Sequence, residues 1–191
     1  MGVLTNVEVE LTFPLLNQEA LKRRLAELAR PEKQQEYQKD TYYIPAHRNF
    51  LKQKPISEWL RVRETQKGAS LNYKFWHNQD DAQAVSADEL ETEVSDVGAV
   101  KNILRRLDIK EVVIVEKRRS TWMYKDVEIA IDEVTDLGSH IELEAKGEFA
   151  SVEEAKKRLY VVLKEIGAKT GLQDFRGYPH LLLEKQGLLK N

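Results

Sequence analysis

The sequence alternates between polar and apolar residues along several short segments, a pattern typical of β-strands whose two faces differ. The clearest example is residues 6–13 (NVEVELTF), in which every even position is polar and every odd position is apolar. Six further alternating segments are predicted strands: residues 60–63, 71–75, 90–94, 113–119, 127–134 and 139–146. Residues 40–43 (DTYY), rich in β-forming residues, are predicted as an eighth strand.

Three other segments show helical periodicity. Asn17, Asp96 and Ser151 are suitable N-caps, and each precedes apolar residues at a spacing of three or four. Such apolar stripes are suited to cover one side of a sheet. The sequence therefore predicts one α+β domain over residues 1–191. A faint repeat, in which an E-x-E strand leads to a helix and three strands, predicts two similar halves near residues 1–85 and 86–191 that close one barrel.

Five predicted strands carry two charges of the same sign, two residues apart. The pairs are Glu8 and Glu10, Arg61 and Arg63, Glu91 and Glu93, Lys117 and Arg119, and Glu142 and Glu144. Residues two apart on a strand point the same way, so the charges within each pair repel each other. For a single strand, exposure to water is the plain explanation. Five such pairs favour a second explanation. In it, the charged faces meet across a barrel lumen and surround a ligand that carries both positive and negative charge.

A triphosphate with magnesium or manganese is a ligand of that kind. Magnesium is usually shared between a few carboxylates and the phosphates of a substrate. Phosphate oxygens in turn bind guanidinium and ammonium groups. We therefore expect acidic pairs to hold Mg²⁺ or Mn²⁺ and basic pairs to hold phosphates.

Other chemistries find little support in the sequence. It contains no cysteine, and its four histidines lack metal-ligand spacing. The 32 acidic and 30 basic residues give a net charge of -2, which argues against binding a nucleic-acid polymer. No run of eighteen apolar residues and no secretory signal is visible, so we expect no membrane association and a cytoplasmic location. The oligomeric state is left open between a monomer and a homodimer.

The order of these motifs resembles one family over nearly the whole chain. The matching segments are Glu8-Val-Glu10-Leu-Thr12, Asp40-Thr-Tyr-Tyr43, Leu60-Arg61-Val-Arg63-Glu64, Lys74, Glu91-Thr-Glu93, Lys117-Arg-Arg119, Asp132 through Gly138 to Glu142-Leu-Glu144, and Tyr178-Pro-His-Leu-Leu182. The sequence is similar to the CYTH family, the triphosphate tunnel metalloenzymes, which include class IV adenylate cyclases and thiamine triphosphatases.

The resemblance implies an eight-stranded antiparallel closed β-barrel, a tunnel, flanked by α-helices. It implies that the metal ligands come from Glu8, Glu10, Asp132, Glu142 and Glu144. It implies that Arg61, Arg63, Lys74, Lys117 and Arg119 bind the substrate phosphates, and that Glu10, Arg63, Lys74 and Glu144 are the catalytic residues. Glu91 and Glu93 are left open between a second metal site, orienting the basic residues, and internal salt bridges.

One position departs from the family pattern. The E-x-E-x-K signature has Thr12 in place of its lysine. A hydrogen bond between charged groups contributes roughly 1.5–3 kcal/mol, so its loss would weaken phosphate binding. Lys146 shares the face of Glu142 and Glu144 by parity, and we hypothesise that it substitutes.

Three functions are consistent with these residues. The first is an adenylate cyclase that converts ATP to cyclic AMP and pyrophosphate; residues 45–50 (PAHRNF) resemble a stretch common in proteins labelled class IV adenylate cyclase. The second is a triphosphatase acting on thiamine triphosphate or tripolyphosphate. Trp59 would suit a cationic thiazolium, although plain packing explains it as well. The third is a non-catalytic binder of nucleotide or polyphosphate, which the change at Thr12 favours.

Overall fold

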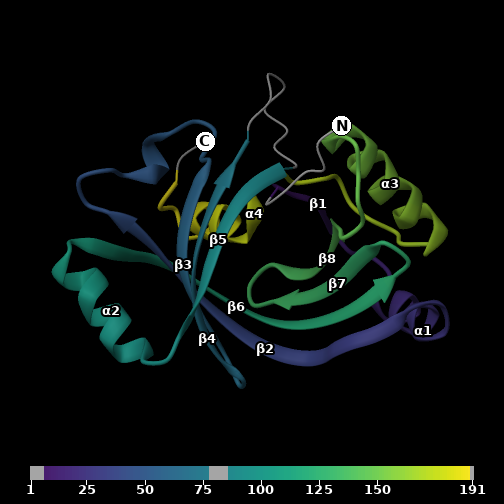
Figure 1. Ribbon diagram of the computed structural model, residues 1–191, viewed down its shortest axis with the longest axis horizontal. Coiled ribbons are helices and arrows are strands. Elements are labelled where there is room, and N and C mark those ends of the chain that lie inside the picture. The colour runs from purple at the N-terminus through teal and green to yellow at the C-terminus, as the bar shows by residue number, and fades with distance from the viewer. Residues whose placement is uncertain (1–6, 78–85, 190–191) are drawn as a thin grey trace.

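The computed structural model describes residues 7–77 and 86–189, and within them eight antiparallel strands close into a barrel (Figure 1). Around the barrel the order is β1-β5-β4-β3-β2-β6-β7-β8. The strands are β1 (Val7–Pro14), β2 (Arg30–Pro45), β3 (Glu58–Thr65), β4 (Gly68–Trp76), β5 (Ser86–Val94), β6 (Ile109–Tyr124), β7 (Val127–Val134) and β8 (Gly138–Ala145). The predicted α+β barrel is confirmed. Asn6, which begins the first predicted strand, and residues 78–85 lie outside the described residues.

Four α-helices accompany the strands in the described part of the chain. They are α1 (Gln18–Leu28), α2 (Val97–Arg106), α3 (Val152–Glu165) and α4 (Gly177–Lys185), and a 3₁₀ turn spans Phe50–Lys52. The side chains of Asp96 and Ser151 accept hydrogen bonds from the backbone N–H groups of Ala99 and Glu154, as their cap positions predict. Asn17 precedes α1, but its side chain bonds to Gly167 and Lys169 instead.

The sequence analysis did not predict α4, and it underestimated β2. Pro179 lies in the first turn of α4, where proline is tolerated, although from the sequence it suggests a loop. The first half of β2 is mostly polar, and register shifts interrupt its pairing with β6 between Pro31 and Lys33 and between Lys33 and Glu36. Such bulges break the period of two that marks a strand.

Two apolar clusters lie on the outside of the barrel. α1 and α3 cover the outer face of β1, β7 and β8, where Leu11, Ile129 and Leu143 are almost completely buried. α2 covers part of the outer face of β2 and β3 through Leu104, which packs with Tyr43 and Val62. Because these apolar residues face outward, their alternating neighbours must face the lumen.

The third apolar cluster involves α4 and the lumen side of the strands. Its buried members are Tyr42, Trp59, Val113, Val115, Val134, Tyr178, Leu182 and Leu183. Each strand residue among them is an even number of positions from the inward-facing charged residues of the same strand, and therefore lies on the same face. They therefore point inward, and α4 packs on them from the barrel end (Figure 1). α4 thus closes one end of the barrel with apolar side chains and leaves the rest of the lumen polar.

The order of the elements repeats along the chain. β1-α1-β2-β3-β4 is followed by β5-α2-β6-β7-β8. Exchanging each strand with its counterpart, β1 with β5 and so on, leaves every neighbour relation in the barrel unchanged. This topology agrees with the two halves expected near residues 1–85 and 86–191, whose superposition stays a prediction. In the described ranges, none of the helices has both the length and the apolar character required to cross a bilayer.

Leu183→Ala tests whether α4 belongs to the core. Leu183 is 1% exposed, and truncating a buried leucine typically costs about 2–5 kcal/mol of stability. We expect urea unfolding to show a loss of that order. Leu172→Ala, at a position 92% exposed, is the control and should change little. Equal stability of the two variants would show that α4 does not contribute to the core.

Candidate functional site

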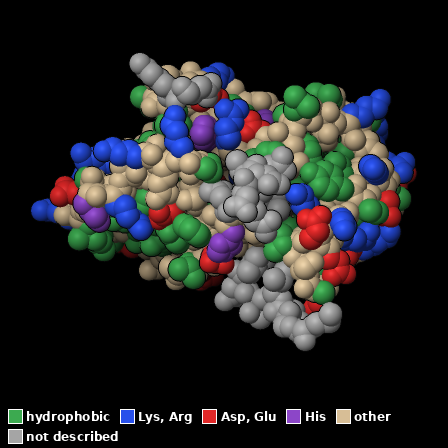
Figure 2. Space-filling model, turned by 90° about the horizontal axis from the view of Figure 1, so that it is seen from above, with side chains coloured by type: hydrophobic (Ala, Val, Ile, Leu, Met, Phe, Trp, Pro, Cys, Tyr) green, Lys and Arg blue, Asp and Glu red, His purple; other side chains and the backbone are tan. Residues whose placement is uncertain are grey.

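The lumen contains a cavity of about 400 Å³, lined by residues from all eight strands. The amino-terminal end of α4 and the segment before β3 also contribute to its lining. The size is within the range of small-molecule sites, but the lining is unusually rich in ionisable groups. On the face seen in Figure 2, basic, acidic and hydrophobic side chains lie in small interspersed groups.

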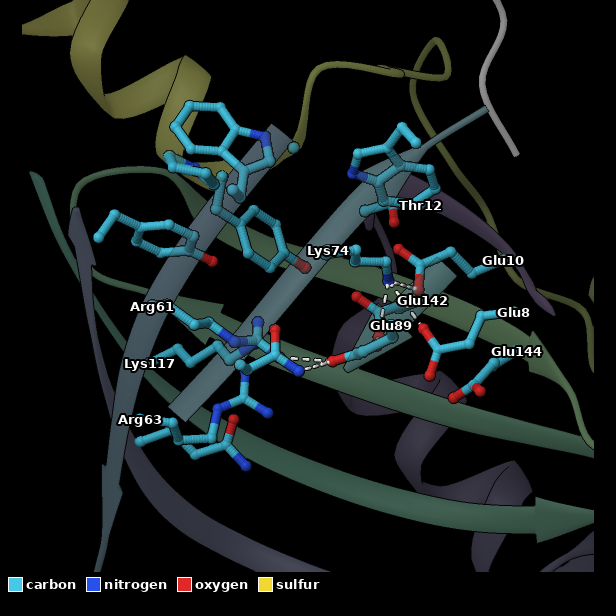
Figure 3. Close-up of a pocket in the computed structure, with 18 of the residues that line it drawn as sticks. Glu8, Glu10, Thr12, Arg61, Arg63, Lys74, Glu89, Lys117, Glu142 and Glu144 are labelled. Atoms are coloured by element: carbon cyan, nitrogen blue, oxygen red, sulfur yellow. Dashed lines mark hydrogen bonds and ion pairs between the residues drawn. The ribbon is translucent and has the colours of Figure 1, made fainter. Parts of the chain in front are cut away.

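Of the basic side chains, Arg61, Arg63 and Lys117 gather on one side of the cavity, whereas Lys74 lies beside the glutamates (Figure 3). Arg61 and Arg63 come from β3, Lys74 from β4, and Lys117 and Arg119 from β6. All five predicted phosphate-binding residues therefore line one cavity. Burial and the neighbouring Arg119 lower the pKa of Lys117 to about 8, so part of its charge is lost at mildly alkaline pH.

Acidic side chains gather on the opposite side, where β1 adjoins β8 (Figure 3). Glu10 lies directly opposite Glu144 in the strand register, and Thr12 lies opposite Glu142. Glu8 is one step further along β1. The four carboxylates of these glutamates form what we call the acidic wall. Burial raises the pKa of Glu144, consistent with acidic neighbours crowded together.

Lys74 connects the two sides of the cavity. Its Nζ donates to Glu8 Oε2 and to Glu10 Oε2, each at 2.9 Å, and lies 4.5 Å from the centre of the Trp76 ring. Burial opposes its charge, but the carboxylates of Glu10 and Glu8 outweigh burial and raise the pKa of Lys74. Lys74 is thus fully charged and already held at the edge of the acidic wall.

Two buried aspartates hold the arginines at the back of the cavity. Asp40 on β2 accepts two hydrogen bonds from Arg63, both of 2.7 Å. Asp132 on β7 accepts two from Arg119, of 2.7 and 2.6 Å. Burial opposes ionisation of both carboxyls, but the adjacent guanidinium groups outweigh it and hold both pKa values well below the usual range. Both carboxylates stay charged across the working pH range.

Glu89 on β5 is a site residue that the sequence analysis missed. It accepts a hydrogen bond from Asn72, and its oxygens lie 3.4 Å from Arg61 Nη2 and 3.7 Å from Lys74 Nζ. Burial opposes its ionisation, but a hydrogen bond from Glu8 and the nearby cations lower the pKa of Glu89 to about 2. Burial and the same hydrogen bond raise the pKa of Glu8 to about 8.

The predicted pair on β5 is only partly in the cavity. Glu91 lines it and accepts a hydrogen bond of 2.7 Å from Ser70, while Glu93 is exposed and does not line it. Glu89 lies on the same face of β5 as Glu91 and Glu93, two residues before Glu91 and closer to the centre of the cavity. The sequence signal that could have identified Glu89 was the extension of the E-x-E motif to E-x-E-x-E. Leu90, between Glu89 and Glu91, is exposed.

Lys146 and Thr12 lie at different depths in the same cavity. Thr12 is opposite Glu142, and Lys146 is four residues further along, about 13 Å at the usual rise of a strand. Lys146 Nζ lies 2.5 Å from Glu144 Oε1. It therefore supplies a cation to the acidic wall at Glu144, whereas at the Thr12 end the cation beside Glu142 is Arg119, at 3.0 Å.

The segment that resembles cyclase-labelled proteins has a structural role. Asn49 caps the short 3₁₀ turn by accepting from Leu51 N, and Phe50 is 2% exposed. Arg48 pairs with Glu58 at 2.8 Å. None of residues 45–50 lines the cavity. Trp59 does line it, but is mostly buried and packs edge-on against Tyr42, with ring centres 5.5 Å apart.

The acidic wall has suitable donors for a divalent cation. In the ranges 7–77 and 86–189, no three histidine, aspartate or glutamate side chains converge on a preformed metal site. The opposed glutamates of β1 and β8 nevertheless present carboxylate oxygens, the donors that Mg²⁺ and Mn²⁺ prefer, beside open cavity. A cation held by a few of them and by substrate oxygens fits this arrangement.

The fold and the cavity define a class of protein: an antiparallel β-tunnel whose lumen presents basic side chains on one side and acidic ones on the other. The chain belongs to the CYTH family, because the family model described as the CYTH domain matches residues 6–178. The predicted family resemblance is thus confirmed.

Individual relatives agree with this membership. A protein of Methanocaldococcus jannaschii, provisionally named as an adenylate cyclase, is 27% identical over 72% of this chain and 76% of its own. The PH1819 protein of Pyrococcus horikoshii is 32% identical, with a TM-score of 0.79 over 93% of this chain and 99% of its own. A Hippeastrum protein, provisionally named as an adenylyl cyclase and described as having a dominant triphosphatase activity, has a TM-score of 0.62 at 16% identity over 96% of both chains.

The raised pKa of Glu8 predicts a pH-dependent stability. An acid whose pKa rises on folding binds its proton more tightly in the folded state, so its contribution to stability falls as pH rises. For Glu8 this contribution to stability begins to fall near pH 4.5 and is lost above about pH 8. In metal-free protein we expect Glu8→Gln to match the wild type below this window and to be more stable above it, because glutamine keeps a donor and carries no charge. Urea unfolding at several pH values measures the difference.

Glu148→Gln, at an exposed position, is the control for this series. Its stability relative to the wild type should not vary across the same window. If the difference between Glu8→Gln and the wild type is also independent of pH, Glu8 is not protonated in the folded protein and the assignment fails.

Proposed function

We propose that this protein is a metal-dependent enzyme that acts on a nucleotide or other triphosphate inside the tunnel. The observation that carries the proposal is the division of one enclosed cavity into a basic side and an acidic wall. Like charges brought together in a closed space repel strongly, because the effective dielectric constant there is low. A polyanion with a divalent cation neutralises both sides at once.

Each set of residues has a distinct part in this proposal. Arg61, Arg63, Lys74, Lys117 and Arg119 bind and orient the phosphate chain. Glu8, Glu10, Glu142 and Glu144 hold Mg²⁺ or Mn²⁺. When bound, the cation neutralises phosphate charge and lowers the pKa of a coordinated nucleophile. Lys74 lies between the two sets, and its ammonium group stabilises the negative charge that develops on a phosphate near the acidic wall.

The first candidate reaction is cyclisation of ATP to cyclic AMP and pyrophosphate. It is supported by the name of the Methanocaldococcus relative and by a cavity that continues from the charged region to the aromatic side chains of Trp59 and Trp76, which offer an apolar surface to an organic group. The motif that first favoured this reaction, residues 45–50, does not contribute, since it lies outside the cavity lining.

The second candidate reaction is hydrolysis of thiamine triphosphate or inorganic tripolyphosphate. The Hippeastrum protein described as a triphosphatase shares the fold, and hydrolysis requires the same phosphate and metal contacts. The third candidate, binding without turnover, rests on Thr12. A lysine there would add a cation opposite Glu142, next to Arg119, and its absence lowers the positive charge near one end of the chain of phosphates.

A substrate panel separates the three functions. We expect the protein to convert ATP, thiamine triphosphate or tripolyphosphate when Mg²⁺ or Mn²⁺ is present, and not when the metal is chelated. Cyclic AMP identifies the first reaction and orthophosphate the second. Glu10→Gln should lower turnover by about a hundredfold or more, on the scale of removing one group that stabilises the transition state, while the fold is retained. Tight binding of a triphosphate without any product would establish the third function, a non-catalytic binder.

Lys146→Ala tests the cation that lines the acidic wall. If Lys146 contributes to triphosphate binding, its removal should weaken binding by about tenfold, the scale of one charge-assisted hydrogen bond. Calorimetric titration with tripolyphosphate measures the change. Lys125→Ala removes a lysine that pairs with Glu165 outside the cavity and is the matched control. Equal affinities for the two variants would remove Lys146 from the site.

A further inference from the structure

The pairs Asp40 with Arg63 and Asp132 with Arg119 have the same construction. In each pair the two residues are direct cross-strand partners, Asp40 with Arg63 and Arg119 with Asp132. In each, the arginine uses Nε and Nη2 to donate to both carboxylate oxygens. The aspartates are 1% and 0% exposed, respectively. Two independent strand pairs thus hold a guanidinium group of the cavity in the same way.

The surroundings of Asp132 leave little room for a further ligand. Besides Arg119, its Oδ2 accepts a hydrogen bond of 3.0 Å from the hydroxyl of Tyr178 and lies 3.5 Å from Lys117 Nζ. Cα register also places His140 beside it on β8. A cation at this carboxylate would meet the positive charges of Arg119 and Lys117. Asp132 is also not among the side chains that line the cavity.

Asp40 is enclosed in a similar way. Its Oδ2 lies 3.6 Å from Arg61 Nη1, so it compensates two guanidinium groups. It too is absent from the cavity lining, although Arg61 and Arg63 are both part of it. Both aspartates therefore stand behind the basic residues, on the side away from the open space.

An arginine held in this way still has donors for a ligand. The guanidinium carries five N–H groups in a fixed plane, and a bidentate carboxylate uses one on Nε and one on Nη2. The Nη1 group takes no part in either aspartate pair. A guanidinium whose plane is fixed loses less side-chain entropy when it binds a phosphate.

We propose that Asp40 and Asp132 are positioning residues, which orient Arg63 and Arg119 for a polyphosphate, and that neither carboxylate binds the metal. The proposal rests on the proposed function of the tunnel. It assigns Asp40 a role that the sequence analysis did not give it. It also gives Asp132 a role different from the metal ligand that the family resemblance implies, and it leaves the metal to the glutamates of the acidic wall.

Two binding measurements without turnover test the proposal. Asp40→Asn and Asp132→Asn are titrated with tripolyphosphate in the absence of metal and, separately, with Mn²⁺ alone. Asparagine cannot accept from both Nε and Nη2, because its amide nitrogen is a donor. We expect both variants to bind tripolyphosphate about ten- to a hundredfold more weakly, on the scale of lost charge-assisted hydrogen bonds, with Mn²⁺ binding unchanged.

The alternatives predict different results. If the aspartates only reduce the positive charge, removing one negative charge strengthens tripolyphosphate binding, and the proposal is wrong. If Asp132 is a metal ligand, Asp132→Asn weakens Mn²⁺ binding, and the proposal is equally wrong. Failure of the wild type itself to bind tripolyphosphate would instead overturn the proposed function, together with everything that rests on it.

Two further variants guard against effects on folding. Asp126→Asn disrupts a bidentate pair with Arg158 outside the cavity, at 2.6–2.9 Å, and should leave both affinities unchanged. Should Asp132→Asn fail to fold, Tyr178→Phe removes only the hydroxyl that donates to Asp132. We expect Tyr178→Phe to weaken tripolyphosphate binding severalfold with Mn²⁺ binding unchanged; wild-type affinity for tripolyphosphate in this variant would contradict the role of Asp132.

Discussion

The contact between a buried aspartate and an arginine on the neighbouring strand is the interaction on which this site depends. A closed barrel removes most water from its lumen, and an isolated charge moved there from water costs several kcal/mol even after relaxation. Eight lysine and arginine side chains line the cavity, and the five on β3, β4 and β6 form its basic side. They are tolerated because Asp40, Asp132 and Glu89 each lie within hydrogen-bonding or ion-pair distance of them. The basic side is thus a compensated network that retains a positive excess.

The same constraint explains why the lumen is polar only in part. α4 fills one end with apolar side chains, so the charged groups share a limited volume. Tyr178 belongs to both regions: it packs among the apolar residues, while its hydroxyl donates to Asp132. The helix that closes the barrel is therefore also linked to the arginine network. The Tyr178 hydrogen bond thus connects the packing of α4 to the carboxylate that Arg119 contacts.

Parity along the strands predicted much of this arrangement, since a period of two specifies the face on which a side chain lies. It identified the inward positions of Glu8, Arg61 and Glu142 without knowledge of the fold. Parity says nothing about depth, and for this reason Lys146 is on the expected face but far from Thr12. It also says nothing about partners. Arg61 and Arg63 look like a repulsive pair in the sequence, whereas in the structure Asp40 lies near both.

The remaining gaps have physical causes of the same kind. The role of Asp40 depends on which strand lies next to β2, and pairing between distant strands is not encoded in a local pattern. Glu89 was missed because residues 86–89 (SADE) do not alternate between polar and apolar, so the predicted strand began only at Leu90. α4 was missed because its apolar residues face a barrel end, and the helix therefore lacks the one-sided stripe that marks α1 to α3.

The repeated topology makes the distribution of charge informative. Exchange of the halves relates β1 to β5, and both carry inward glutamates. In the other three exchanged strand pairs, the inward-facing charges of the two strands have opposite signs. Arg63 on β3 corresponds to the strand of Asp132, Lys74 on β4 to the strand of Glu142, and Asp40 on β2 to the strand of Arg119. A lumen with the same charges on both halves would suit a ligand of one sign. Asp40 and Asp132 lie behind the cavity lining, so the reversal that faces the open lumen is the one between Lys74 and Glu142, and it suits a ligand whose two ends differ in charge.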